Sequence, residues 1–287
     1  MTIDSTVSSQ ATRAVTRPNS FIFSMYGDLA HDAAEDAHEA PAIWIGGLIR
    51  LMAAFGVSSA AVRQAVSRMS RQGWIVAHKR GTRAYYSLTE RGADRIASLI
   101  PRIYGPILEW DGSWRLLAYT VPEKHRERRD RLRKELAVLG WAPLAASLWI
   151  SPNNALPAAR AAATSSAIDA NIALFEGGYR GPLSDRELVE RCWDLPTIAA
   201  AYDDFNRMYR PRLENERRTG RLSDEEAFVE RLWLVHDYRK FTYVDPGLPS
   251  TLLPGGWPGS HAAATFREYH RSLHRKATTF FEGATKP

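Results

Sequence analysis

The amino-acid sequence predicts an α+β protein in three parts: an N-terminal winged helix-turn-helix, a middle ferredoxin-like βαββαβ domain and a mainly helical C-terminal domain. Three observations lead to this prediction. An amphipathic pattern with an arginine-rich face precedes an alternating hairpin pattern at residues 57–88. Strand-like and helix-like patterns alternate between residues 114 and 176. After residue 185 most segments have helical period.

The first half of residues 57–88 has the pattern of a recognition helix. Apolar residues recur at positions i, i+3, i+4 and i+7, which predicts one buried stripe. The stripe consists of Val62, Ala65, Val66 and Met69. Ser58 or Ser59 is expected to cap the helix, and Gly73 is expected to end it.

The opposite face of this helix carries guanidinium, amide and hydroxyl groups, which bond phosphates and base edges in a DNA major groove. The candidate DNA-binding residues of the helix are Ser58, Ser59, Arg63, Gln64, Ser67, Arg68 and Arg71. The alternative is an ordinary amphipathic helix, because helix-turn-helix packing also occurs in proteins that bind no DNA.

The second half of residues 57–88 alternates like a β-hairpin. Residues 74–78 and 84–88 are rich in strand-forming side chains, and Gly81 between them permits the positive φ of a tight turn. Three cations at the tip suit a wing that contacts the DNA backbone or minor groove. The candidates here are Lys79, Arg80, Thr82, Arg83 and Tyr86. The alternative is a solvated, charged hairpin.

The charge of the chain is unevenly distributed. The whole sequence has a formal net charge of +6, but residues 50–102 alone contain ten Lys and Arg against two acidic residues, a local net charge of +8. Such a concentration is the electrostatic footprint of a polyanionic partner, here double-stranded DNA. A basic surface that only favours solubility is the alternative.

Length and composition exclude several classes of protein. A chain of 287 residues has room for two or three domains. It has no apolar run long enough for a membrane span and no apolar signal-peptide core, so we expect a cytoplasmic protein without a membrane partner. Cys192 is the single cysteine, which excludes an internal disulfide and a multi-cysteine metal site. We expect it to be a small buried side chain.

Breaks in the patterns predict the domain boundaries, the first at Tyr104-Gly105-Pro106. The expected parts are a flexible N-terminus at 1–18, the winged helix-turn-helix at 19–104, the ferredoxin-like domain at 105–180 and the helical domain at 181–287.

Within the first domain, residues 43–45 predict a short strand that closes the wing sheet, and residues 46–55 predict the helix before the recognition helix. Residues 31–41 combine acidic residues with histidines and are expected to form an exposed loop. They lack the spacings of known metal sites, so no metal is expected there.

In the middle domain the order of elements is that of a split βαβ arrangement. The expected elements are a strand at 114–121, a helix at 123–139, strands at 141–144 and 146–150, a helix at 155–166 and a strand at 170–175. The C-terminal helices are expected at 185–193, 197–216, 224–241 and 262–281. A capping box opens the third, and the Pro- and Gly-dense residues 245–260 are expected to be neither helix nor central strand.

Several motifs, in a fixed order, carry a family resemblance. They are Tyr26–Asp28, Ile43–Gly46, Leu48–Met52, Ala61–Met69, Gly73-Trp74, Arg80-Gly81, Tyr85–Thr89, Trp110–Trp114, Leu148–Pro152, Asp245-Pro246, Leu248-Pro249, Leu253-Pro254 and Trp257–Gly259. Together they resemble the PaaX family of bacterial transcriptional regulators, best known as repressors of phenylacetate degradation genes. The resemblance extends from about Phe21 to Phe281. The chain departs from the family in its extended N-terminus, which is unmatched, and in the loop at 30–41, which is long and acidic.

The resemblance implies a function. The middle domain would be similar to the CRISPR protein Cas2 and would form a homodimer, which would bind a palindromic operator. The C-terminal region would sense a small-molecule effector, an aryl-CoA thioester such as phenylacetyl-CoA, that releases the repressor from an aromatic-compound catabolic operon. The alternatives are a regulator that responds to a free aromatic acid or another small molecule, and an aryl-CoA-binding protein that acts through protein partners. Salt-dependent binding to its own promoter region separates the last alternative from the first two.

Four residues are candidates for effector binding: His236, Arg239, Lys240 and Trp257. The two cations would hold CoA phosphates or a carboxylate. The alternative is a polar helix edge, because neighbouring helical residues do not face each other. Trp257 either anchors its Pro- and Gly-rich loop to a core or lines an aromatic pocket.

The sequence gives no support for catalysis. It contains no GxSxG motif, no P-loop and no GxGxxG motif beside a strand. A Cas2-like nuclease would need a metal-binding Asp just after the first strand of the middle domain, where this chain has Val121-Pro122-Glu123, while Asp111 precedes the strand. We therefore expect no catalytic residues, no metal and no cofactor.

Overall fold

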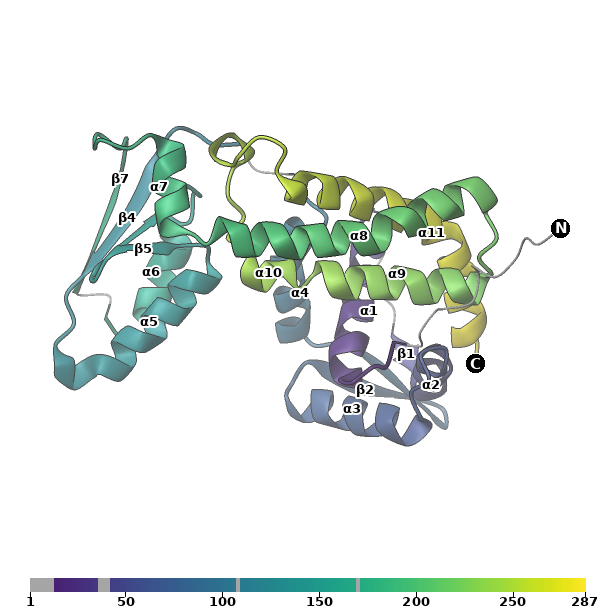
Figure 1. Ribbon diagram of the computed structural model, residues 1–287. Coiled ribbons are helices and arrows are strands. Elements are labelled where there is room, and N and C mark those ends of the chain that lie inside the picture. The colour runs from purple at the N-terminus through teal and green to yellow at the C-terminus, as the bar shows by residue number, and fades with distance from the viewer. Residues whose placement is uncertain (1–12, 36–41, 107–108, 169–170) are drawn as a thin grey trace. The chain divides into compact units, whose positions relative to one another are not determined.

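The computed structural model describes residues 13–35, 42–106, 109–168 and 171–287. Most of the N-terminus that the sequence predicts to be flexible lies outside these residues, as does the acidic stretch after Glu35. The described chain mixes helices and sheets (Figure 1). No described helix is both long enough and apolar enough to cross a membrane.

The N-terminal elements are helices around a small antiparallel sheet with the strand order β1-β3-β2. Their bounds are α1 (Pro18–Glu35), β1 (Ile43–Trp44), α2 (Ile45–Ala53), α3 (Ser59–Arg71), β2 (Ile75–Arg80), β3 (Arg83–Leu88) and α4 (Glu90–Ile103). The short strand β1 pairs with β3, Ile43 opposite Tyr86, so it closes this sheet as predicted.

Helix α3 confirms the predicted pattern. All four residues of the expected stripe are buried. The Ser58 side chain accepts a hydrogen bond from the backbone N–H of Ala61 at 3.3 Å, so Ser58 and not Ser59 is the cap. Gly73 follows the helix with a φ of +71°, the left-handed conformation that glycine adopts without strain.

The acidic stretch after residue 30 departs from expectation. Residues 31–35 are not an exposed loop but continue α1 to Glu35. The reason is tertiary: the Asp32 carboxylate binds the buried guanidinium of Arg231 in a later helix, which fixes the end of α1.

The middle part has the predicted order of strands and helices. Its elements are β4 (Trp114–Tyr119), a 3₁₀ turn η1 (Glu123–His125), α5 (Arg126–Val138), β5 (Ala142–Ala145), β6 (Leu148–Ser151), α6 (Leu156–Ser165) and β7 (Ile172–Gly177). The strand order is β5-β6-β4-β7, antiparallel throughout. Leu132 and Leu136 of α5 and Ala159 of α6 pack in one core with Leu117 and Trp149 of the sheet.

The C-terminal part is helical. Its elements are α7 (Asp185–Cys192), α8 (Leu195–Thr219), α9 (Asp224–Tyr238), α10 (Phe241–Val244), a 3₁₀ turn η3 (Ser250–Leu252) and α11 (Pro258–Thr285). The helix expected at 224–241 begins as predicted, but its predicted end is wrong, because α9 stops at Tyr238 and α10 follows as a separate short helix. Backbone hydrogen bonds between residues three apart, such as Thr242 N–H to the Arg239 carbonyl, separate the two helices. Helix α11 begins four residues earlier than expected, because Pro258 suits a first helical position that needs no N–H donor.

The chain forms two compact units. The first unit contains the described part of residues 1–100 together with 215–236 and 268–287. The second contains 101–214 and 237–267. Helices α8, α9 and α11 therefore contribute residues to both units. In the first unit, Phe228 of α9 and Ala277 of α11 share one hydrophobic core with Met25 of α1 and Val66 of α3.

Candidate nucleic-acid interface

The burial of one side of α3 determines which side chains reach solvent on the other. Arg63, Gln64, Ser67, Arg68 and Arg71 are all exposed, and so are Ser58 and Ser59 at the start of the helix. Within the described residues, no carboxylate forms a salt bridge with any of these three arginines. The exposed face of α3 is therefore a row of cations and amide or hydroxyl groups, and the described part of the chain places no carboxylate against its arginines.

The hairpin between β2 and β3 carries the second group of candidates. Arg80 pairs with Arg83 across the turn, and Gly81 has the predicted positive φ, at +61°. Lys79, Arg80, Thr82 and Arg83 are exposed. The guanidinium of Arg80 lies 5.1 Å from the ring centre of Tyr85, and that of Arg83 lies 5.3 Å from the ring of Trp44. These aromatic rings support the cations while leaving their N–H groups available to a ligand.

Tyr86 has a different environment from the other hairpin candidates. It is half-buried and packs against the core of the first unit. Its carbonyl accepts a hydrogen bond from the hydroxyl of Tyr26 at 2.7 Å, so this residue joins the sheet to α1. The exposed face of α3 and the hairpin tip both carry cations, the kind of group that binds the phosphates of a polyanion.

The four effector candidates lie in separate surroundings. In the first unit, His236 has its Nδ1 3.1 Å from the Ser24 hydroxyl, and its ring lies 4.3 Å from that of Phe21. In the second unit, Arg239 is buried and the ammonium of Lys240 binds Asp237 at 2.8 Å.

Trp257, also in the second unit, is half-buried and belongs to the edge of a hydrophobic core. Its ring lies 6.3 Å from that of Tyr202, and the side chains of both limit the space at Gly259, where an added Cβ would come within 2.6 Å of the indole nitrogen. This packing agrees with a loop anchor, the first of the two roles considered for Trp257.

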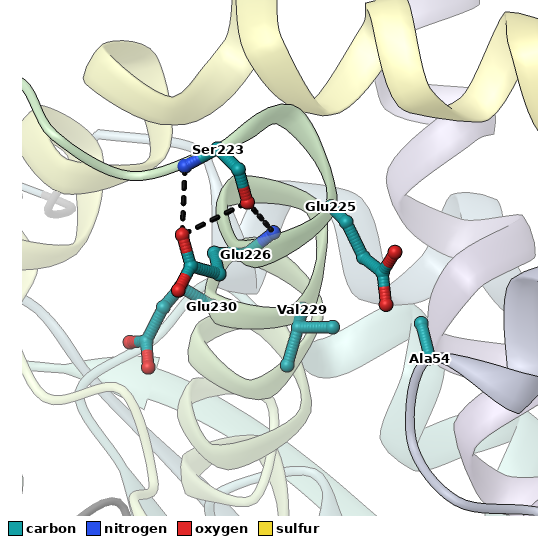
Figure 2. A pocket seen from close by; sticks show the side chains of 6 residues that line it. All are labelled: Ala54, Ser223, Glu225, Glu226, Val229 and Glu230. Atoms are coloured by element: carbon teal, nitrogen blue, oxygen red, sulfur yellow. Dashed lines mark hydrogen bonds between the residues drawn. The ribbon is translucent and has the colours of Figure 1, made fainter. Parts of the chain in front are cut away.

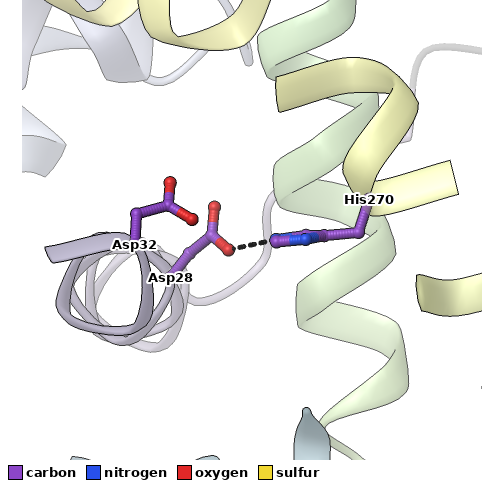
Figure 3. Close-up of side chains that lie close together, drawn as sticks. All are labelled: Asp28, Asp32 and His270. Carbon is purple, nitrogen blue, oxygen red and sulfur yellow. Dashed lines mark hydrogen bonds and ion pairs between the residues drawn. The ribbon is translucent and has the colours of Figure 1, made fainter. Parts of the chain in front are cut away.

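A buried charge cluster was missed by sequence reasoning. Arg231 of α9 donates from Nε to Asp28 at 2.7 Å and from Nη2 to Asp32 at 2.6 Å. From α11, His270 donates from Nε2 to Asp28 at 2.6 Å (Figure 3). Burial opposes ionisation of Asp28, but Arg231 and His270 outweigh it and hold the pKa of this carboxyl well below its ordinary value. The sequence signals here were the Tyr26-Gly27-Asp28 motif and the acidic stretch that contains Asp32, and neither pointed to Arg231.

Asp28, Asp32 and His270 also bring three potential metal-ligand atoms within 4.8 Å of one another. The guanidinium of Arg231 already binds both carboxylates, and its own side chain is 4% exposed. A divalent cation would have to displace this buried charge. The geometry is that of an ion-pair network centred on arginine.

An acidic hollow of about 390 Å³ lies at the start of α9 (Figure 2). Ser223 and Glu226 form the predicted capping box: the backbone N–H of Ser223 donates to the Glu226 carboxylate at 2.8 Å, and the N–H of Glu226 donates to the Ser223 hydroxyl at 3.2 Å. Glu225 and Glu230 complete the acidic lining. Glu225 and Glu226 lie in the first turn of α9, where negative charge stabilises the start of a helix.

Sequence comparison supplies the family. Three family models match the chain: the PaaX-like protein model at residues 17–92, the PaaX protein central Cas2-like domain at 108–189 and the PaaX-like protein C-terminal domain at 193–283. The transcriptional repressor PaaX of Escherichia coli (strain K12) is 34% identical over 251 residues, which cover 85% of this chain and 76% of that protein. The chain belongs to the PaaX family. The sheet β5-β6-β4-β7 is accordingly its Cas2-like central domain.

A solved structure is also similar. The uncharacterized protein Rv0674 from Mycobacterium tuberculosis matches 91% of this chain and 97% of its own chain, with a TM-score of 0.59 and 22% identity. This likeness extends over both compact units and concerns the fold.

Proposed function

We propose that the chain is a transcriptional repressor that binds operator DNA through a winged helix-turn-helix made of α2, α3 and the β2–β3 hairpin. The exposed face of α3 carries this proposal, because Arg63, Arg68 and Arg71 lie there with no carboxylate partner among the residues that the structure describes, opposite a fully apolar buried stripe. In such modules the second helix enters the major groove and its side chains read base edges. The repressor function named for the Escherichia coli relative supports the same assignment.

The hairpin would act as the wing. Lys79, Arg80 and Arg83 are exposed and would contact phosphates or the minor groove beside the helix, which adds affinity without sequence preference. Helix α3 would read the sequence through Arg63 and Arg68, and Gln64 and Ser67 would tune the preference.

The active species would be a homodimer formed through the Cas2-like domain. Within the described sheet β7 is an edge strand, and its Phe175 is 58% exposed. An edge with an exposed aromatic residue is a surface that a second copy can cover. Two copies would present two recognition helices to half-sites spaced by whole helical turns, about 10 base pairs or a multiple.

The repressor would be released by a small molecule from an aromatic catabolic pathway, an aryl-CoA thioester such as phenylacetyl-CoA. The effector would bind the DNA-incompetent arrangement more tightly and so shift the population away from the operator. The candidate contacts are Arg239, Lys240 and Trp257 in the second unit and, as a separate location, His236 in the first unit. The protein would act in the cytoplasm and would not be an enzyme.

Footprinting on the intergenic DNA upstream of the gene tests this function. The protein should protect two half-sites, and phenylacetyl-CoA should remove the protection. The Arg63→Ala/Arg68→Ala double variant should lose this protection. If its footprint at low salt equals that of the wild type, α3 does not read the DNA. Protection that no thioester removes would refute the effector but leave the repressor function standing.

A further inference from the structure

A cavity of about 320 Å³ lies within the first unit, lined by residues of α1, α9 and α11. Its walls are mostly apolar and include Leu29, Phe228, Leu232 and Phe281. This volume and this lining are typical of sites for small molecules, which combine an apolar wall with a few convergent polar groups.

The polar groups gather around Arg231. Its Nη1 lies 2.7 Å from Nδ1 of His274, and an arginine can only donate. Nδ1 of His274 therefore accepts this hydrogen bond. The side chain of His274 is 46% exposed and that of Asp32 is 18% exposed, so both are accessible from the cavity, whereas Arg231 is 4% exposed.

The cavity has a net negative charge. Asp28, Asp32 and Glu282 line it, and Arg231 neutralises one of these three carboxylates. Even a protonated His270 beside Asp28 leaves one negative charge. Glu282 lies in the last turn of α11, and a helix C-terminus adds negative potential.

We propose that this cavity binds a small organic cation with an apolar body, of the arylalkylammonium class. The ammonium would bind the carboxylates of Asp32 and Glu282, and the aryl group would lie between Leu29, Phe228 and Phe281. Carboxylates and aromatic rings together are the groups that attract an ammonium in a partly desolvated site. A coenzyme A thioester is polyanionic and much larger than the cavity, so this ligand differs from the effector proposed above.

A ligand in the cavity would change the position of α3. Met25 and Phe228 line the cavity and belong to the same hydrophobic core as Val62 and Met69 of α3. Close-packed cores transmit small displacements, so a bound ligand would alter the position of α3 in the first unit. This regulatory consequence rests on the proposed DNA-binding function, whereas the ligand site does not.

Calorimetry on the full-length protein without DNA tests the site, with 2-phenylethylammonium, phenylacetate and 2-phenylethanol as cationic, anionic and neutral probes of matched size. The cation should bind at least tenfold more tightly than the other two. Thr278 lines the cavity, and Thr278→Phe should weaken binding at least tenfold by filling it. Thr279, an exposed neighbour on the same helix, provides the control Thr279→Phe, which should bind like wild type.

Two results with the wild type would overturn the proposal: no binding of the cation, or tighter binding of phenylacetate than of the cation. A Thr278→Phe variant that unfolds at the wild-type temperature and binds the cation with wild-type affinity would also overturn it. Asp32→Asn should reduce affinity for the cation about tenfold but affect the neutral probe little, since only the cation uses its charge. Equal effects on both probes would contradict the charge assignment. A separate operator-binding titration with the cation tests the link to α3; binding without any effect on DNA affinity would refute the regulatory step alone.

Discussion

Arg231 donates from Nε to a carboxylate oxygen of Asp28 at 2.7 Å, although 203 residues separate the two in sequence. Their side chains are 4% and 11% exposed, so both charges have left water. A buried ion pair gains little net stability over an apolar pair, because the cost of desolvation offsets the attraction. Breaking it is costly, however, since one charge is left buried without its partner. The pair therefore joins α1 to α9 in addition to their shared hydrophobic core.

Replacing Arg231 should destabilise the protein strongly. Arg231→Leu leaves Asp28 and Asp32 without their guanidinium, and the free energy of unfolding should fall by about 3–5 kcal/mol. Urea unfolding followed by circular dichroism measures the change. Arg207→Leu is the control, because Arg207 is exposed and its pair with Asp204 lies at the surface, where such pairs contribute about 0–1 kcal/mol. Equal losses in the two variants would mean that the buried network does not stabilise the fold.

The same network predicts a sensitivity to acid. The pKa of Asp28 is lower in the folded protein than in the unfolded chain, so its ionised form stabilises the fold. This contribution is complete above the unfolded pKa of about 4 and is lost as the pH falls below it toward the folded value. As the pH is lowered from 6 to 2, the urea concentration at the unfolding midpoint should fall for the wild type. It should fall less for Asp28→Asn. Parallel profiles would place the acid sensitivity elsewhere.

Two arginines of α3 should account for sequence recognition. Arg63→Ala and Arg68→Ala should each cost roughly 1–3 kcal/mol of operator affinity and relax the preference at one base position. Fluorescence anisotropy with operator and scrambled duplexes measures both effects. Arg210→Ala, which removes an exposed cation paired with Glu214 in the second unit, should leave binding unchanged. Wild-type affinity in both α3 variants would exclude this face from the interface.

The wing should contribute affinity but not specificity. Arg80→Ala should weaken binding to operator and scrambled DNA alike and reduce the slope of log affinity against log salt by about one. Titrations at several salt concentrations provide the slope. An Arg80→Ala slope equal to that of the wild type would show that Arg80 does not contact the DNA.

The dimer should depend on the exposed edge of the Cas2-like sheet. Phe175→Glu places a charge where a second copy would exclude water, and the protein should sediment as a monomer. It should also lose most of its operator affinity, because one half-site is then bound instead of two. Tyr243→Ser, which removes an aromatic residue 54% exposed elsewhere in the second unit, is the control and should remain dimeric. A dimeric Phe175→Glu protein would locate the interface on another surface.

The features that the sequence by itself determined are local ones. The stripe of α3, a serine cap at Ser58 or Ser59, its end at Gly73 and the turn at Gly81 all follow from residues within a few positions of one another, and the structure selects Ser58 as the cap. The order of strands and helices in the middle domain follows from hydrophobic period within each element in the same way. Local periodicity also placed the candidate cations of α3 on one exposed face.

Tertiary structure alone decided how distant segments meet. Periodicity shows that a face is buried but not against what, so it did not predict that α9 and α11 complete the core around α1 and α3. The sequence predicted that Asp32 lies in an exposed loop and indicated no role for Arg231. Charged residues are mostly exposed, so burial of one is not expected until its partner is known. The division of α8, α9 and α11 between two compact units has the same origin. Contacts across more than 200 residues carry no periodic signal, and only the folded chain brings those groups together.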